Sequence, residues 1–276
     1  MSSNSDHHIR VEHTDGVATI RFTRPSKHNA ASGQLLLETL EALYRLESDD
    51  SVGAIVLTGE GAVFSAGFDL EEVPMGPASE IQSHFRLKAL YYHAVIHMLA
   101  RIEKPTLAAI NGPAVGGGLG MSLACDLAVC TDRATFLPAW MSIGIANDAS
   151  SSFYLPRIVG YRRAMEWLLT NRTLAADEAY EWGVVNRVFS EADFQSRVDE
   201  IARQLAAAPT HLQGLVKNRI QEGSSEALES CTEHEVQNVI ASVGHPHFAE
   251  RLAMFRSKEM RSSALAVDLD AVCGGQ

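Results

Sequence analysis

The sequence predicts an α/β protein with a mainly helical C-terminal region, and three features of the chain carry this prediction. Up to residue 163, strand and helix signals alternate in the order typical of βαβ units. The run "SVGAIVLTG" (51–59) is apolar nearly throughout, as expected for a strand buried on both faces of a parallel sheet. Beyond this part most segments have helical periodicity. We therefore expect an α/β core over residues 1–163, with a frayed polar tail over about 1–8, and a helical region over residues 164–276.

The elements of the core follow one another in a regular order. A turn at Thr14-Asp15-Gly16 predicts a hairpin in which Ile9 and Val11 pair with a strand that ends at Phe22. The next elements alternate and are a helix over 32–48, the strand 51–59, a helix over about 79–101, a strand at 106–112, a helix beginning at the glycines 116–118, and a strand at 126–132. Crossovers of this kind place ligand sites at the carboxyl ends of the strands.

The C-terminal region is predicted to be helical with one short strand, "GVVNRVF" (183–189). Pro209 and Pro246 mark breaks in the helical pattern. The expected helices cover residues 161–170, 175–182, 191–207, 211–221 and 225–243. Because no flexible linker precedes them, we expect these helices to pack against the core or a neighbouring subunit.

Composition excludes several classes of protein. Hydrophobic residues make up 46% of the 276 residues and charged residues 21%, which is ordinary for a globular enzyme. The net charge of −11 argues against a nucleic-acid partner, because there is no basic surplus to displace counterions from phosphates. The start lacks the apolar segment of a secretory signal, and glycines and Asp126 interrupt the most apolar run, so we expect no membrane span.

The cysteines are few and show no metal spacing. They form no CxxC pair and are Cys125, Cys130, Cys231 and Cys273. Four cysteines in a chain of this length suggest reduced thiols and a cytoplasmic protein. His93 and His97 lie one helical turn apart, but no third ligand has metal spacing, so we expect no metal site.

Two glycine-containing loops could hold an oxyanion. "FSAGFDL" (64–70) and "NGPAVGGGLG" (111–120) each follow a predicted strand of the sheet. Glycine lets a ligand approach the backbone closely, and the first turn of a helix offers unpaired N–H groups. Two such groups converging on one carbonyl oxygen would form an oxyanion hole. Tight packing of helix on strand also demands glycine, so each loop alone leaves both readings open.

Asp148 has two readings as well. It lies in "AWMSIGIANDASSSF" (139–153), where an apolar run ends and small polar residues follow. Asn and Asp favour helix starts because their side-chain oxygens accept from N–H groups of the first turn. From the local sequence alone, Asp148 is therefore expected to be a helix cap rather than a reactive group.

The two glycine loops together make the chain resemble the enoyl-CoA hydratase/isomerase superfamily, or crotonase fold. The resemblance covers roughly residues 10–260, including "RPSKHNA" and "LTNRTLAADEAYEWGVVNRVF". It implies a core of ββα repeats and a homo-oligomer such as a trimer. It also implies that two backbone N–H groups bind the thioester oxygen of an acyl-CoA, at positions that match Phe68 and Gly117.

Particular residues narrow the resemblance within this superfamily. The hydratases use two glutamates, whose positions carry Gly120 and Trp140 here. Dienoyl-CoA isomerases have an aspartate that matches Asp148, but their second carboxylate again falls at Trp140. The stretches "AWMSIGIANDASSSF", "RLKALYYHAVIHML" and "CTEHEVQNVIASVGHPHF" are similar to the members that dehalogenate aryl-CoA thioesters. This resemblance implies that Asp148 is the nucleophile, that Trp140 hydrogen-bonds its carboxylate, and that His93 activates water.

The activity so implied is the hydrolysis of 4-chlorobenzoyl-CoA to 4-hydroxybenzoyl-CoA and chloride, with no cofactor because coenzyme A is part of the substrate. Substrate contacts are expected from Ala66, Gly67, Phe68, Asp69, Leu70, Phe85, Tyr92, Gly116, Gly117, Gly118 and Trp140. His28 and Glu71 stand where basic residues meet the CoA phosphates in similar proteins. The residues expected to contact the phosphates in their place are Lys27, His28, Arg256, Lys258 and Arg261.

The sequence alone leaves two other classes of function open. One is another acyl-CoA enzyme of the superfamily, of the dienoyl-CoA isomerase or thioesterase type. The other is a CoA-binding or RNA-associated homologue that has lost its chemistry. The acidic charge argues against RNA, and the presence of Asp148, His93 and Trp140 argues against loss of activity.

Overall fold

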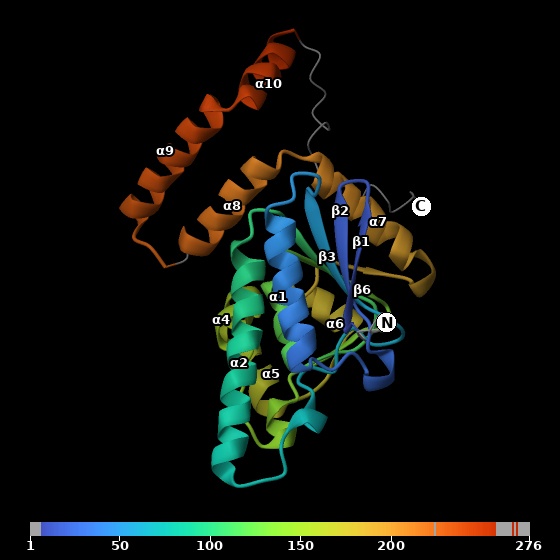
Figure 1. Cartoon of the computed structure of the whole chain (residues 1–276). Coiled ribbons are helices and arrows are strands. Elements are labelled where there is room, and N and C mark those ends of the chain that lie inside the picture. The colour runs from blue at the N-terminus through green and yellow to red at the C-terminus, as the bar shows by residue number, and fades with distance from the viewer. Residues whose placement is uncertain (1–6, 224, 258–266, 268, 270–276) are drawn as a thin grey trace, which may run out of the picture.

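The chain begins with a β-hairpin attached to the first helix (Figure 1). A computed structural model describes residues 7–223, 225–257, 267 and 269. β1 (Ile9–Thr14) pairs antiparallel with β2 (Val17–Phe22) across a two-residue turn with positive φ, as predicted. The backbone N–H of His8 donates to Glu38 in α1 (Gly33–Glu47) at 2.8 Å. Residues 7 and 8 of the expected frayed tail are therefore held against a helix, whereas residues 1–6 lie outside the described part.

Six strands form the main sheet, and its parallel strands all end at one edge. From β2 onward the neighbours are parallel, in the order β1-β2-β3-β4-β6-β9. The added strands are β3 (Ala54–Gly59), β4 (Thr106–Ile110), β6 (Leu127–Thr131) and β9 (Arg187–Phe189). A small second sheet consists of β5 (Ala114–Val115), β7 (Thr135–Leu137) and β8 (Leu174–Ala175). Both glycine loops leave the carboxyl edge, one after β3 and one after β4.

Helices cover both faces of the main sheet. α1, α2 (Ala78–Arg101) and α3 (Gly117–Ala124) bury Leu36, Leu99 and Leu119 in the larger hydrophobic core. On the other face, α7 (Glu191–Ala207) packs Val198 and Ile201 against the apolar side chains of β3, β4 and β6. Three short 3-10 turns lie in the loops around the site, η1 (Pro25–Lys27), η2 (Leu70–Glu72) and η3 (Trp140–Ile143). The predicted α/β core with ββα character is thus confirmed.

The core extends beyond residue 163, where the sequence placed its boundary. That boundary falls inside α5 (Tyr161–Thr170), and β9 continues the main sheet. α5 and α7 have the predicted bounds, and α4 (Ser151–Val159) is the helix expected after Asp148, whereas α10 (Pro246–Arg256) was not predicted. Pro246 begins a helix, because the first helical position needs no N–H. The other helices of this region are α6 (Ala176–Glu181), α8 (Thr210–Gly223) and α9 (Leu228–Gly244).

α9 and α10 form an arm that projects from the body of the molecule (Figure 1). No residue of α9 is buried, although the helix carries Val236, Val239 and Ile240, which are half or more exposed. No helix among the described residues is long and apolar enough to span a membrane.

Candidate active site

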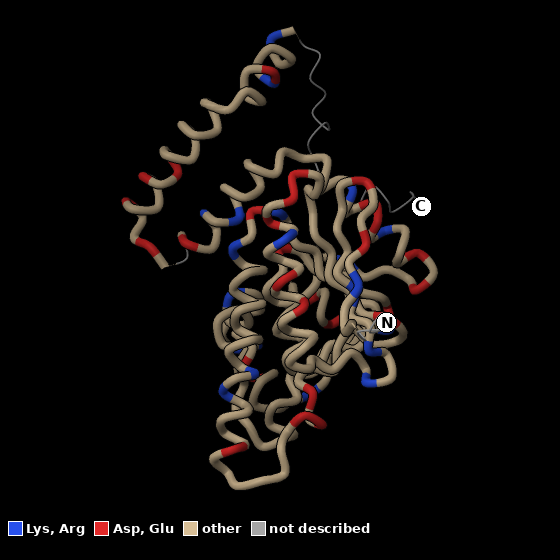
Figure 2. Tube along the Cα trace, viewed as in Figure 1, with Lys and Arg blue, Asp and Glu red and all other residues tan. Residues whose placement is uncertain are grey.

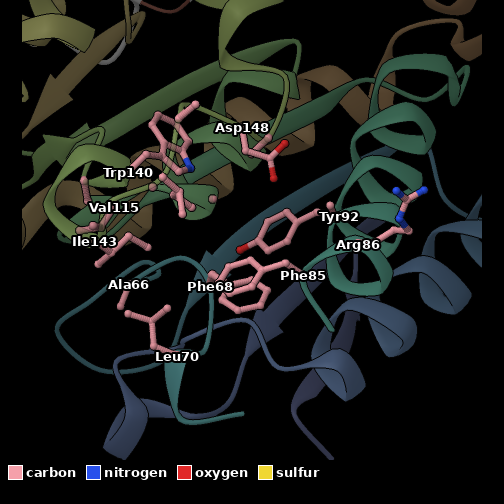
Figure 3. A pocket seen from close by; sticks show the side chains of 17 residues that line it. Ala66, Phe68, Leu70, Phe85, Arg86, Tyr92, Val115, Trp140, Ile143 and Asp148 are labelled. Atoms are coloured by element: carbon pink, nitrogen blue, oxygen red, sulfur yellow. The ribbon is translucent and has the colours of Figure 1, made fainter. Parts of the chain in front are cut away.

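An apolar cavity of about 560 Å³ lies where the two glycine loops meet α2 and η3 (Figure 3). The residues predicted for the site that line it are Ala66, Phe68, Leu70, Phe85, Tyr92, Gly116, Gly117, Trp140 and Asp148. Lining residues that the sequence did not single out are Arg86, Ala89, Val115, Ala139, Ile143, Ile145, Ala146 and Ala149. Helical spacing from Phe85 would have pointed to Ala89, one turn farther along α2. The predicted site residues that do not line the cavity include Gly67, Asp69, Gly118 and His93, the last of which contacts Asp148.

The two glycine loops approach each other through their backbones. Val115 donates its N–H to the carbonyl of Ser65 at 2.9 Å. Gly67 has a φ of +83°, and a Cβ built on it would lie 2.9 Å from the nitrogen of Gly117, so a side chain here would separate the loops. The next N–H, that of Phe68, and the N–H of Gly117 make no hydrogen bond within the described residues. Gly117 also opens α3, whose N-terminal end favours negative charge. Two free donors beside one apolar cavity can stabilise a carbonyl oxygen that gains charge.

Asp69 supports this loop from behind and does not face the cavity. Its side chain is only 5% exposed and accepts from the Arg24 guanidinium at 2.7 Å. The same guanidinium donates to the carbonyl of Ala30 at 2.5 Å. The other Asp69 oxygen accepts from the N–H of Glu71 at 3.1 Å. Asp69, predicted as a substrate contact, therefore fixes the loop that carries Phe68 instead of lining the cavity.

Asp148 is not the cap of α4. The N-cap is Ser150, and the side chain of Asp148 instead contacts His93 Nε2 at 2.8 Å from Oδ1. The segment turns sharply here, because Ala149 and Ser150 both have positive φ, which is strained for residues other than glycine. Only the Asp148 carbonyl takes part in the local turn, accepting from the N–H of Ser151 at 3.1 Å. The strained turn leaves the carboxylate directed at the cavity and at His93.

Gly120 makes room for this turn. A Cβ built on it would lie 2.4 Å from the Cβ of Ala149, the residue after Asp148. A glutamate at position 120 would therefore need the turn to move. Asp148 is the one carboxylate among the described residues that line the cavity. The site thus lacks the pair of carboxylates that hydration of a double bond would use.

Aromatic side chains form the walls of the cavity. Phe68 and Phe85 are stacked, with ring centroids 5.0 Å apart and an interplanar angle of 16°. Trp140 is 5% exposed and follows Ala139, whose φ is positive. The family resemblance implied a hydrogen bond from its indole to Asp148, but the described contacts contain none. The described partner of this carboxylate is His93. Flat rings of this kind suit an aromatic substrate.

The predicted contacts to the CoA phosphates differ in their surroundings. Lys27 forms an exposed ion pair with Glu71, at 2.5 Å. His28 supports the first glycine loop through its backbone, because its carbonyl accepts from the N–H of Ala66 at 2.9 Å. Arg256 ends α10, at the end of the molecule remote from the start of α2 (Figure 1). Arg261 and Lys258 lie outside the described residues. Figure 2 shows basic and acidic residues interspersed along the trace.

His93 and His97 both lie on α2. Their ring centroids are 6.4 Å apart, and no group of three or more potential ligands in the described part of the chain could hold a metal ion.

The chain is similar in sequence and in structure to several known proteins. A model of the enoyl-CoA hydratase/isomerase family matches residues 12–262. Two proteins of Arthrobacter sp., named 4-chlorobenzoyl coenzyme A dehalogenase-1 and -2, are each 98% identical to this chain over its full 276 residues and their own full length. The 1,2-epoxyphenylacetyl-CoA isomerase of Escherichia coli (strain K12) is 31% identical over 78% of this chain and 82% of its own. Among solved structures, an enoyl-CoA hydratase from Bacillus anthracis superposes with a TM-score of 0.86 at 29% identity, covering 91% of this chain and 96% of that one.

Proposed function

The chain belongs to the enoyl-CoA hydratase/isomerase family, and we propose that it hydrolyses the carbon–chlorine bond of 4-chlorobenzoyl-CoA through a covalent ester on Asp148. The substrate and the reaction rest on the two relatives that are 98% identical over the whole chain. The covalent route rests on the cavity, where one carboxylate lies beside an apolar space that also contains two free N–H groups. Coenzyme A arrives with the substrate, and the proposed steps require no other cofactor.

The first step is attack by Asp148 on the ring carbon that carries chlorine. Oδ1 accepts from His93 Nε2, which leaves Oδ2 to form the new C–O bond. The electron pair moves into the ring and on to the thioester oxygen, para to the chlorine. The Phe68 and Gly117 amides and the N-terminal end of α3 would stabilise that charge. The C–Cl bond then breaks, chloride leaves with the electron pair, and an aryl ester of Asp148 remains.

The second step is hydrolysis of this ester. Ester formation removes the negative charge of Asp148, so the hydrogen bond from His93 Nε2 weakens. The hydrogen on Nε2 then passes to solvent while Nδ1 carries the ring N–H, so the Nε2 lone pair faces a water molecule. His93 takes a proton from water as the oxygen attacks the carboxyl carbon of Asp148. The bond between that carbon and the aryl oxygen breaks, and the departing oxygen takes up a proton to give 4-hydroxybenzoyl-CoA. The side chain of His93 is 37% exposed, so protons can exchange with solvent between turnovers.

Trp140 is proposed to position Asp148 when the substrate ring is bound. Both residues line the same cavity, and the Trp140 indole N–H is a hydrogen-bond donor with no partner among the described contacts. Phe68 and Phe85 would hold the ring at a fixed angle to the carboxylate.

The decisive experiment for this function is incubation of the protein with 4-chlorobenzoyl-CoA, followed by measurement of chloride and of 4-hydroxybenzoyl-CoA in equal amounts. Asp148→Asn should bind the thioester and release no chloride, because an amide is a poor nucleophile. Formation of 4-chlorobenzoate instead would indicate a thioesterase. Substantial multiple turnover by Asp148→Asn would exclude the covalent route.

We also propose that the α9–α10 arm binds a second copy of the chain, in a small homo-oligomer such as a trimer. Its exposed apolar residues, together with an apolar groove of about 690 Å³ between α4, α7 and α8, give each copy two complementary apolar surfaces. The mass in solution tests this proposal. Cys125, Cys130 and Cys231 are free thiols, which fits the cytoplasm as the proposed compartment.

A further inference from the structure

The hydroxyl of Tyr92 is buried and has no partner, although it belongs to a residue of the cavity wall. Tyr92 is 2% exposed, and its oxygen makes no hydrogen bond within the described residues. A buried hydroxyl left in this way lowers the stability of a protein, because it loses its hydrogen bonds to water and gains none in return. A ligand acceptor that enters the cavity would supply the missing bond.

The position of this hydroxyl selects the acceptor. A Cβ built on Gly117 would lie 2.4 Å from the Tyr92 oxygen, so the hydroxyl is adjacent to the amide that forms one side of the oxyanion site. In Figure 3 the hydroxyl points away from Asp148 and toward the side of the cavity where Phe68 lies. An oxygen bound between the Phe68 and Gly117 amides would lie on the side to which the Tyr92 hydroxyl points, and Asp148 lies on another side.

We infer that the Tyr92 hydroxyl is a third hydrogen-bond donor to the thioester oxygen of the substrate, beside the Phe68 and Gly117 amides. The inference rests on the proposed orientation of the substrate. A third donor adds to the stabilisation of charge that the ring passes to this oxygen during attack by Asp148. A phenol is also a stronger acid than a backbone amide, so it bonds more tightly to an oxygen that carries charge.

The electrostatics of the site keep this donor protonated. Burial raises the pKa of the Tyr92 phenol, and the negative charge of Asp148 raises that pKa further. The proton therefore stays on the hydroxyl throughout the pH range in which the enzyme would work. This agrees with a role as donor and excludes a role as proton acceptor in the resting state.

Tyr92→Phe tests the inference, because it removes one oxygen and keeps the ring. Tyr91→Phe is the matched control, since Tyr91 is half-buried on the same helix and does not line the cavity. In rapid single turnovers, Tyr92→Phe should form the aryl ester about 100-fold more slowly, as expected for the loss of one oxyanion donor. Bound 4-hydroxybenzoyl-CoA should show a smaller red shift of its absorption in this variant, because less charge is drawn toward the carbonyl.

Two further readouts separate a donor from a structural residue. Without ligand, Tyr92→Phe should melt at the same temperature as the native protein or higher, because it removes an unpartnered polar group. An S-(4-chlorobenzyl)-CoA thioether, which lacks the carbonyl oxygen, should bind equally well to the native protein and to Tyr92→Phe.

The inference is overturned if Tyr92→Phe keeps both the ester-forming rate and the red shift within twofold of the Tyr91→Phe values. It is also overturned if affinity for the thioether falls as much as affinity for 4-hydroxybenzoyl-CoA, because the hydroxyl then binds another atom. The spectral measurement needs no turnover. Native protein that binds 4-hydroxybenzoyl-CoA but releases no chloride would therefore count against the proposed function and leave the test of Tyr92 intact.

Discussion

His93→Gln should slow hydrolysis of the covalent ester far more than its formation. In the resting protein His93 donates to Asp148 Oδ1 at 2.8 Å, between side chains that are 37% and 42% exposed. An amide N–H of glutamine can replace part of this bond, so ester formation should slow by about 5-fold, equivalent to roughly 1 kcal/mol. Removal of the general base should slow hydrolysis by at least about 100-fold. If the two native steps are equally fast, about half of the native enzyme carries the aryl group at steady state, and this fraction rises to about 95% in the variant.

A quenched-flow experiment measures this fraction directly. Variant and native protein are mixed with ring-labelled 4-chlorobenzoyl-CoA, quenched in acid and digested, and the label is located on the peptide that contains Asp148. His97→Gln is the control, because His97 lies one turn away and has no contact with Asp148 among the described hydrogen bonds. Equal slowing of both steps, with no additional label, would refute the role of His93 as base and leave only a role in positioning Asp148.

The remaining predictions concern the CoA end of the site and the turn that carries the nucleophile. Glu71→Gln should lower the KM for 4-chlorobenzoyl-CoA by about 3- to 5-fold at low salt, because it frees Lys27 to bind a phosphate of coenzyme A. The effect should disappear at high salt, which screens exposed charges. An unchanged KM at low salt would show that Lys27 does not bind a phosphate. Gly120→Ala should lower chloride release by about 100-fold while the protein stays folded by circular dichroism, because its Cβ displaces the turn at Ala149. Gly244→Ala, at a position with nothing within 4 Å of the new Cβ, is the control, and equal activity of the two variants would contradict this account.

The sequence predicted the parts of the fold and site that depend on local patterns. The hairpin turn at Asp15-Gly16, the fully buried β3 and the bounds of α7 follow from glycine, apolar runs and helical spacing, and the structure has all three. The glycine loops predicted two close backbone approaches. Their meeting at Gly67 and Gly117 was implied by family resemblance, and the backbone distances now give its geometry.

Features that depend on contacts between distant segments were not predictable in this way. Asp69 is adjacent in sequence to Phe68, yet its pairing with Arg24, 45 residues earlier, turns it away from the cavity. The partner of Asp148 is likewise decided by the approach of α2, which brings His93 within hydrogen-bonding distance of it. Helical spacing could place Tyr92 on the cavity face, but only the path of the second glycine loop shows where its hydroxyl lies.

The source of the oxygen in the product tests the covalent role of Asp148 most directly. The protein, in excess over 4-chlorobenzoyl-CoA, is allowed one turnover in water enriched in oxygen-18, and the product and the Asp148 peptide are analysed by mass spectrometry. The covalent route predicts that the first 4-hydroxybenzoyl-CoA carries an unlabelled oxygen taken from Asp148, and that the label appears in the carboxylate of that residue. Product that is labelled at its 4-hydroxyl in the first turnover, with an unlabelled Asp148, would show that water attacks the ring directly and would contradict the account.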